Sequence, residues 1–305
     1  MSNDTVRKAL VALARAGIRS SPYLGHFGSA MLAGHFLCEE LGLSPETIAA
    51  IRDCFPFLTV GEPADLFKNE EKGEEANPEL VDQLREYILG HVGRLSRSGH
   101  VATIGMYALK GLKAEPSAVT PSCVSGIIQL LEAYSVERAE PRYYGYPLEY
   151  TAVNVKRARI QKYKSAKDAL AFSISELHTL YPNTAIDNVY YYFVGEKLHG
   201  LTHAHALYEF ECMGEKKIAT QAYPTHQLQT ILNRVKPPDR EPVKGVSPLT
   251  PEHQEFWRLV PTFKHELGVS HTLKRSYTIL RAQQAGIRGL GRATLQRLSY
   301  VLQRW

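Results

Sequence analysis

The run from Ile186 to Met213 constrains the fold more than any other part of the chain, because it reads as one helix with apolar side chains on almost every side. A helix without a polar stripe is normally buried among other elements. The run nevertheless carries five ionisable side chains, Glu196, His199, His203, His205 and Glu209. Burying such groups is costly unless each is paired, protonated or bound to a metal. The chain therefore needs a core that surrounds this helix and supplies partners for its polar groups.

Helical periodicity extends along nearly all of the 305 residues. Proline marks helix starts at Pro45 and Pro251, and glycine marks helix ends at Gly17, Gly42 and Gly214. The predicted helices cover about 3–17, 22–42, 44–54, 79–94, 97–112, 121–136, 150–163, 166–180, 184–212, 215–234, 252–266, 270–284 and 290–303. We therefore predict an all-α fold, a multi-helix bundle or an α/α toroid of about a dozen helices.

Strand signals are poor. The β-rich patch from Tyr143 to Tyr146 is short and is broken by Pro141 and Pro147, so it reads better as an aromatic loop. The four cysteines are far apart, with no Cys-x-x-Cys pair, and we expect buried free thiols. No apolar run is long enough to cross a membrane and the N-terminus does not read as a signal peptide, so the expected location is the cytoplasm.

Charge is unevenly distributed along the chain. Residues 62–83 carry eight acids against two lysines, whereas residues 267–305 carry seven Lys or Arg and no acid. We predict a main helical domain over 1–235, a Pro-rich linker over 236–250, and a basic helical segment over 251–305 that packs on the main domain. An acidic protein partner could bind the basic segment, whereas nucleic acid is not expected, because the acidic stretch opposes general polyanion binding.

Glu196, His199 and His203 fall within about 60° of one another around the helix axis. Glu-x-x-His with a second His one turn later could hold a divalent metal such as iron. The same set could serve as acid, base and orienting group without a metal. A structural interpretation is also open, in which the histidines bond to core oxygens and Glu196 pairs with Arg157 or Arg159. His205 and Glu209 lie on the other side of the helix and are predicted to form a local pair.

A second candidate region is the helix from Tyr23 to His35, whose many small residues allow close packing or leave room for a ligand. His26 and His35 are nine residues apart and therefore lie on opposite faces. His26, close behind Arg19, is the stronger functional candidate, and His35 is predicted to be a core histidine. The histidines at 178, 265 and 271 are assigned to surface or capping positions, because nothing local directs them inward.

A third candidate is the tract from 134 to 163, where tyrosines alternate with basic residues. Tyrosine can stack on planar aromatics and arginine can clamp anions. The predicted substrate-binding residues are Tyr143, Tyr144, Arg157, Arg159, Tyr192 and Arg19. A solvated basic helix bordered by a structural tyrosine loop would also account for this tract.

The run from Leu198 to Phe210 contains His-Gly-Leu-Thr-His followed by Ala-Leu-Tyr-Glu. It resembles a helix of questin oxidase-like proteins, in which a similar His-Gly-Leu-Ile-His run leads into Tyr-Ala-Leu-Glu. The helix that carries His26 is similar to the N-terminal helix of that family. The resemblance implies an all-α enzyme that tailors a natural product, since named members open polyketide rings oxidatively. This chain differs in Thr202, where the family has an aliphatic residue, and in its basic C-terminus.

Three functions therefore stay open. The first is an enzyme of specialised metabolism that modifies a small molecule, in its oxidative form with Glu196, His199 and His203 holding a metal. The second is a non-redox lyase or cyclase in which His or Glu moves a proton while arginine holds an anionic leaving group. The third is a binder of nucleic acid or of an acidic carrier protein through the basic C-terminus. No phosphate loop, dinucleotide fingerprint or nucleophile elbow is present.

Overall fold

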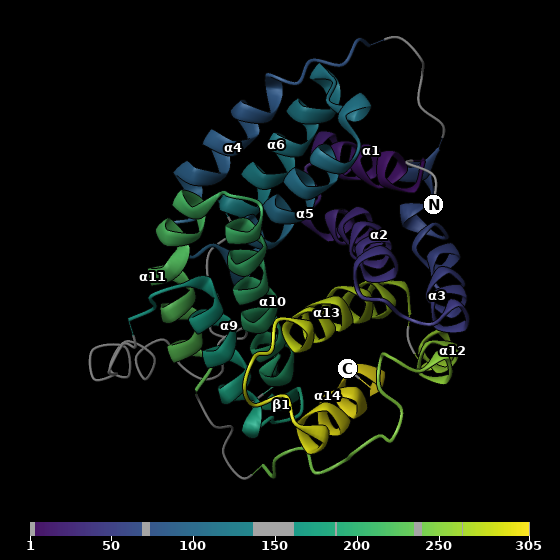
Figure 1. The fold of residues 1–305 in the computed structure, drawn as a ribbon, viewed down its shortest axis with the longest axis vertical. Coiled ribbons are helices and arrows are strands. Elements are labelled where there is room, and N and C mark those ends of the chain that lie inside the picture. The colour runs from purple at the N-terminus through teal and green to yellow at the C-terminus, as the bar shows by residue number, and fades with distance from the viewer. Residues whose placement is uncertain are drawn as a thin grey trace.

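The computed structural model describes residues 4–68, 74–136, 162–186, 188–234, 240–263 and 265–304. The α-helices of these residues are α1 (Asp4–Ile18), α2 (Pro22–Glu40), α3 (Pro45–Arg52), α4 (Leu80–His91), α5 (His100–Ala114), α6 (Pro121–Ser135), α9 (Ala166–Ser175), α10 (Phe193–Cys212), α11 (Lys216–Leu232), α12 (Gln254–Phe263), α13 (Glu266–Gln284) and α14 (Arg292–Arg304). Short 3₁₀ helices are η1 (Phe55–Leu58), η2 (Glu62–Phe67), η3 (Arg97–Gly99), η4 (Pro116–Ala118) and η5 (Glu176–His178). The fold is all-α (Figure 1), as the periodicity predicts.

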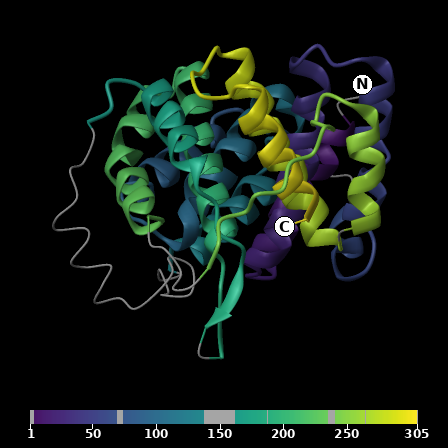
Figure 2. The ribbon, with the colours of Figure 1, turned by 90° about the horizontal axis from the view of Figure 1, so that it is seen from below.

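One predicted helix boundary is wrong. Residues from Thr184 to Tyr191 form a β-hairpin, β1 (Thr184–Ile186) paired antiparallel with β2 (Val189–Tyr191), and α10 starts only at Phe193. β-branched and aromatic residues favour extended pairing, and Asn188 has the positive φ of 63° that a tight turn requires. The hairpin projects from the helical body (Figure 2), so its apolar side chains are not part of the buried helix.

α10 lies at the centre of the molecule and packs against α5, α9, α11 and α13. It is buried on nearly all sides, which confirms the reading of its sequence. α1 packs against α2 and α6, and α13 packs against both α2 and α10. Four helices that are far apart in the sequence, α2, α5, α10 and α13, therefore surround one region of the core.

Small residues permit the closest helix crossings. A Cβ atom at Gly17 of α1 would lie 1.8 Å from the carbonyl oxygen of Gly126 in α6, so only glycine allows this approach. A Cβ atom at Gly28 would lie 2.7 Å from the carbonyl oxygen of Ala9. The small residues that follow Tyr23 are thus used for helix packing.

The C-terminal segment is integrated into the body. Between α11 and α12, the amide of Val243 bonds to the carbonyl of Leu180 at 2.7 Å, and the amide of Ser247 bonds to that of Gln296 at 2.9 Å. Among the cysteines, three are buried as expected, but Cys212 is exposed because it lies in the last turn of α10. Within the described parts of the chain, no helix is long and apolar enough to cross a membrane.

Candidate active site

Four histidines from four helices form a closed ring of side chains beside α10, here called the histidine ring: His26 of α2, His100 of α5, His199 of α10 and His271 of α13. Neighbouring ring centroids are 5.0 Å apart for His26 and His100, 5.0 Å for His100 and His199, 5.4 Å for His199 and His271, and 4.8 Å for His271 and His26. No two of the four are near in sequence. The helix packing alone brings them together.

Glu196 fixes the orientation of His199 within the histidine ring. The two residues are one helical turn apart, and His199 Nδ1 lies 3.0 Å from Glu196 Oε1. Ser98 donates from its hydroxyl to Glu196 Oε2 at 2.7 Å. Ser98 has a φ of 53°, a strained conformation for a residue with a side chain, and such strain concentrates at functional sites. Because Nδ1 faces the carboxylate, Nε2 is the nitrogen through which His199 would act on another molecule.

Two consecutive cations of α13 are buried against the histidine ring. Lys274 is 4% exposed and its Nζ lies 2.7 Å from His26 Nδ1. Burial, reinforced by the neighbouring charge of Arg275, holds the pKa of Lys274 well below its usual range. Arg275 is 3% exposed, and burial lowers its pKa to about 10 although the nearby Glu196 carboxylate favours the charged form. Arg275 therefore stays charged at neutral pH, whereas Lys274 is driven toward its neutral amine.

His271 contributes a buried nitrogen to the histidine ring. Its Nε2 is inaccessible to solvent and has no hydrogen-bond partner among the described residues. Burial holds the pKa of His271 well below its usual value, and the neighbouring Arg275 and Lys274 reinforce the effect. A neutral imidazole with a buried lone pair is the form of histidine that binds metals or accepts a proton.

A cavity of about 370 Å³ opens beside the histidine ring. Its walls are Pro22, Tyr23, His26, Ser98, His100, Asn183, Tyr192, Gly195, Glu196, His199, His265, Leu267, Gly268, His271, Arg275 and Arg304. Its volume lies in the range of small-molecule pockets. We call it the ring cavity.

Some of the predicted site residues line the ring cavity and others do not. His26, Glu196 and His199 meet at the ring cavity, and Tyr192 lines it. His203 does not join them: its Nδ1 lies 2.8 Å from Gln229 Oε1, and its ring packs against Gly99, where a Cβ atom would lie 2.4 Å away.

His203 belongs instead to a buried pair with His226. Their ring centroids are 5.2 Å apart, and His226 contacts Tyr163 through Nδ1 at 3.0 Å and Ser173 through Nε2 at 2.9 Å. Burial lowers the pKa of His203 to about 4 and that of His226 to about 3. His203 is thus a core histidine that bonds to a buried oxygen, as the structural interpretation of the sequence expects. Its ring packs against Gly99, next to Ser98.

The local pair on the other side of α10 is confirmed, since His205 Nε2 lies 3.6 Å from Glu209 Oε1. Arg19 does not reach the ring cavity: it is partly exposed and lies 3.7 Å from Asp65. His35 does not line the ring cavity either. Tyr143, Tyr144, Arg157 and Arg159 lie outside the described residues.

The set Glu196, His199 and His203 does not fit a metal, because Glu196 and His199 bond to each other and His203 faces Gln229. The histidine ring brings four imidazoles together, and the buried Nε2 atom of His271 has no hydrogen-bond partner among the described residues. Among the described residues, no group of three or more His, Cys, Asp or Glu could hold a metal ion with the side chains as they stand.

Part of the positive charge of the basic C-terminal segment is used inside the molecule, whereas Arg288, Arg292 and Arg304 are exposed. Lys274 and Arg275 are buried, and Arg281 donates to Glu209 at 2.8 Å. Arg297 donates to the carbonyl of His178, and Arg304 lines the ring cavity. The charge run in the sequence therefore does not by itself indicate a polyanion-binding face.

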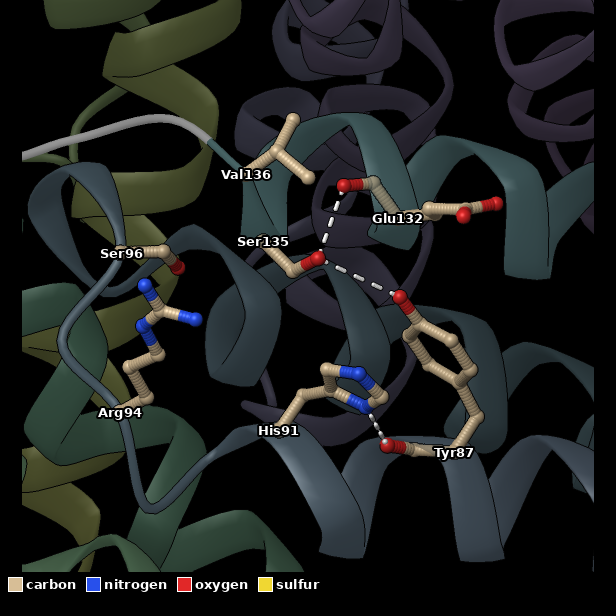
Figure 3. Close-up of a pocket in the computed structure, with 7 residues that line it drawn as sticks. All are labelled: Tyr87, His91, Arg94, Ser96, Glu132, Ser135 and Val136. Carbon is tan, nitrogen blue, oxygen red and sulfur yellow. Dashed lines mark hydrogen bonds between the residues drawn. The ribbon is translucent and has the colours of Figure 1, made fainter.

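A second cavity, of about 270 Å³, lies near the C-terminal ends of α4 and α6. Figure 3 shows Arg94 directed toward Ser96, and the rings of Tyr87 and His91 side by side. The rings of Tyr87 and His91 stack with centroids 4.1 Å apart. This cavity lacks the convergent histidines of the ring cavity, which is therefore the candidate active site.

Several site residues were not found by sequence reasoning: Ser98, His100, His271, Lys274, Arg275 and Arg304. The predicted surface or capping position of His271 is wrong, since the residue is buried in the histidine ring. His100 belongs to no sequence pattern, because each ring histidine lies on a separate helix and spacing carries no signal between helices. Comparison with protein-family models, with curated proteins and with solved structures finds no match for this chain.

Proposed function

We propose that the protein is a metal-dependent enzyme that oxidises an aromatic small molecule, and that the histidine ring holds the metal. The spacing of the four imidazoles is the observation that carries this proposal. With metal–nitrogen distances of about 2.0–2.1 Å, neighbouring ring centroids would stand about 4.5 Å apart at right angles and about 5.2 Å apart at tetrahedral angles. Three of the observed distances, 5.0, 5.0 and 4.8 Å, fall within that range, and the fourth, 5.4 Å between His199 and His271, lies just above it.

The surrounding residues suit such a centre. Glu196 accepts from His199 as carboxylates do beside metal-bound histidines, where they fix the tautomer and the ring orientation. On the other side, Lys274 Nζ lies 2.7 Å from His26 Nδ1, where a neutral amine would accept from the imidazole and an ammonium would donate to it. A redox-active divalent ion such as iron would supply the electron exchange between an aromatic substrate and dioxygen. Oxidative tailoring of this kind is also what the resemblance of residues 198–210 implies.

The test is turnover with and without metal. Protein stripped by a chelator and then reloaded with Fe²⁺ is given a panel of phenolic polyketides, and oxygen uptake is recorded. We expect uptake only in the reloaded protein, and its loss in His271→Ala but not in Cys212→Ser, which changes an exposed residue of α10. Turnover that survives chelation, in protein shown by elemental analysis to hold no metal, would contradict the proposal.

The Glu196–His199 contact favours a second candidate, a non-redox lyase or cyclase. A histidine oriented by a carboxylate is a general base, and Arg275 would stabilise negative charge that develops in the dry cavity. Positioned acid–base groups contribute about 10² to 10⁴ in rate. This function predicts conversion of the same substrates without oxygen uptake, insensitive to chelators and abolished in His199→Ala.

A further inference from the structure

We propose that the substrate of the ring cavity is an anionic aromatic molecule, selected by Arg275 at the inner end and Arg304 at the mouth. The inference rests on the proposed function only in taking this cavity as the substrate site. The shared ligand chemistry is an aromatic ring system bearing one negative group, either a carboxylate or a phenolate.

The charges that line the ring cavity do not cancel. Arg275 and Arg304 contribute two positive charges, and Glu196 is the one carboxylate among the described residues that line the cavity. The Glu196 oxygens already accept from Ser98 at 2.7 Å and lie 3.0 Å from His199. A metal on the histidine ring would add further positive charge, because neutral imidazoles do not offset it. An anion entering the cavity would therefore be attracted to it electrostatically.

The two guanidinium groups differ in burial, which gives the cavity an inner and an outer cation. Arg275 is buried on α13 next to the histidine ring, where the low dielectric strengthens its attraction for an anion. Arg304 is exposed in the last turn of α14, and its guanidinium carbon lies 4.6 Å from the centroid of the Tyr300 ring. This cation–π contact holds Arg304 near the mouth without neutralising it.

The remaining walls supply flat apolar surface. Tyr23 and Tyr192 stand at the starts of α2 and α10, and each is braced edge to face by another ring, Phe27 at 5.5 Å and Tyr190 at 5.1 Å. Both tyrosines are partly exposed, at 41% and 38%, as expected for walls that meet a ligand. Such faces suit aromatic ligands. The cavity of about 370 Å³ has room for two or three fused rings.

Binding of matched probes tests the proposal. The probes are 2-naphthoate, a nitronaphthol that is ionised at neutral pH, and the neutral 2-naphthalenemethanol, each titrated by calorimetry into protein as purified and after chelator treatment. We expect at least one anion to bind roughly 10-fold or more tightly than the alcohol, since charge-assisted contacts are about twice as strong as neutral ones. The tighter of the two anions identifies the negative group.

The variants locate the effect. Arg304→Gln should reduce the preference for the anion roughly 10-fold, whereas Arg292→Gln, an exposed arginine of the same helix that does not line the cavity, should leave it unchanged. Arg275→Gln should reduce it further, and its denaturation curve shows whether it folds. Equal binding of anion and alcohol to the wild type, or an unchanged preference in Arg304→Gln, overturns the inference. If the protein takes up no metal but still prefers the anions, the inferred anionic substrate stands and the proposed metal-dependent function fails.

Discussion

Two polar clusters lie on opposite sides of α10, and they differ in how their charges are met. The histidine ring lies beside a cavity lined by the buried Arg275 and the exposed Arg304, with Glu196 as the carboxylate among the described lining residues. The Glu209 cluster is made up of Glu40, Lys110, His205, Glu209, Tyr277 and Arg281, and none of these residues lines either cavity described above. The same residue types on one helix thus line a cavity on one side and form a closed set of ion pairs on the other.

The Glu209 cluster is internally balanced. Glu209 lies 2.5 Å from Lys110 Nζ and 2.8 Å from Arg281 Nε, and Lys110 also lies 2.9 Å from Glu40. The contacts with His205 and Lys110 hold the pKa of Glu209 below its usual range despite its burial. The two carboxylates, Glu40 and Glu209, therefore neutralise the two cations, Lys110 and Arg281. No ligand is needed to balance the charge of the cluster.

The largest expected effect is on stability. Glu209→Gln leaves Lys110 and Arg281 without their shared carboxylate, and breaking a buried pair in this way costs about 3–5 kcal/mol. Urea denaturation measures the free energy of unfolding. Glu241→Gln, in an exposed pair with Lys244, is the control and should change it by less than about 0.5 kcal/mol. Similar stability of the two variants would mean that the Glu209 cluster is not a structural one.

Acid should unfold the protein through His203 and His226. Their folded pKa values, about 4 and about 3, lie below the ordinary value of 6.5, so the unfolded chain binds more protons as the pH falls from 6.5. Their contribution is present above pH 6.5 and is lost on acidification, by about 1.4 kcal/mol per pH unit for each group. We expect the free energy of unfolding to be roughly 2 kcal/mol lower at pH 5.5 than at pH 7.

Denaturation at several pH values checks this slope. His226→Gln should flatten it, whereas His178→Gln, at an exposed position, should not. A slope that is the same in both variants would assign the acid sensitivity to other groups.

Glu196→Gln should weaken metal binding by roughly 10- to 100-fold, the usual cost of losing a carboxylate behind a metal-bound histidine. Glu211→Gln is the matched control, because Glu211 lies on the same helix but bonds to Tyr223 and the amide of Ala166. Competition with a chromophoric chelator gives both dissociation constants. If the two variants bind metal equally well, Glu196 does not support the histidine ring.

The smallest effect is expected at Arg19. Its side chain is 42% exposed and lies 3.7 Å from Asp65, so Arg19→Gln should change the free energy of unfolding by less than about 0.5 kcal/mol. Binding of 2-naphthoate should also be unaffected, in contrast to Arg304→Gln. Weaker naphthoate binding by Arg19→Gln would show that Arg19 takes part in ligand binding.

The sequence predicts the fold class and the burial of α10, because periodicity and helix caps are local signals. It misplaces the start of α10, since an apolar run of Tyr and Val fits strand and helix alike. Glu196 and His199 could be paired from their spacing within one turn. His203 shares their face but turns toward Gln229, and only the packing of α11 reveals that.

The rest of the site could not be read from the sequence, because it depends on contacts between helices. His100 and His271 lie 171 residues apart and carry no motif of their own. Lys274 and Arg275 belong to a charge run that usually marks a solvated face. Their burial follows from the position of α13 between α2 and α10, which no local pattern encodes.

Metal stoichiometry in two single variants tests the central claim most directly. His271 belongs to the histidine ring. His203 belongs to the metal site that the sequence predicts, but in the structure it faces Gln229. Each variant to alanine is stripped, reloaded with Fe²⁺ under anaerobic conditions, and assayed for bound metal by elemental analysis beside the wild type. We predict one metal per chain in the wild type and in His203→Ala, and none in His271→Ala. Metal retained by His271→Ala and lost from His203→Ala would contradict the account.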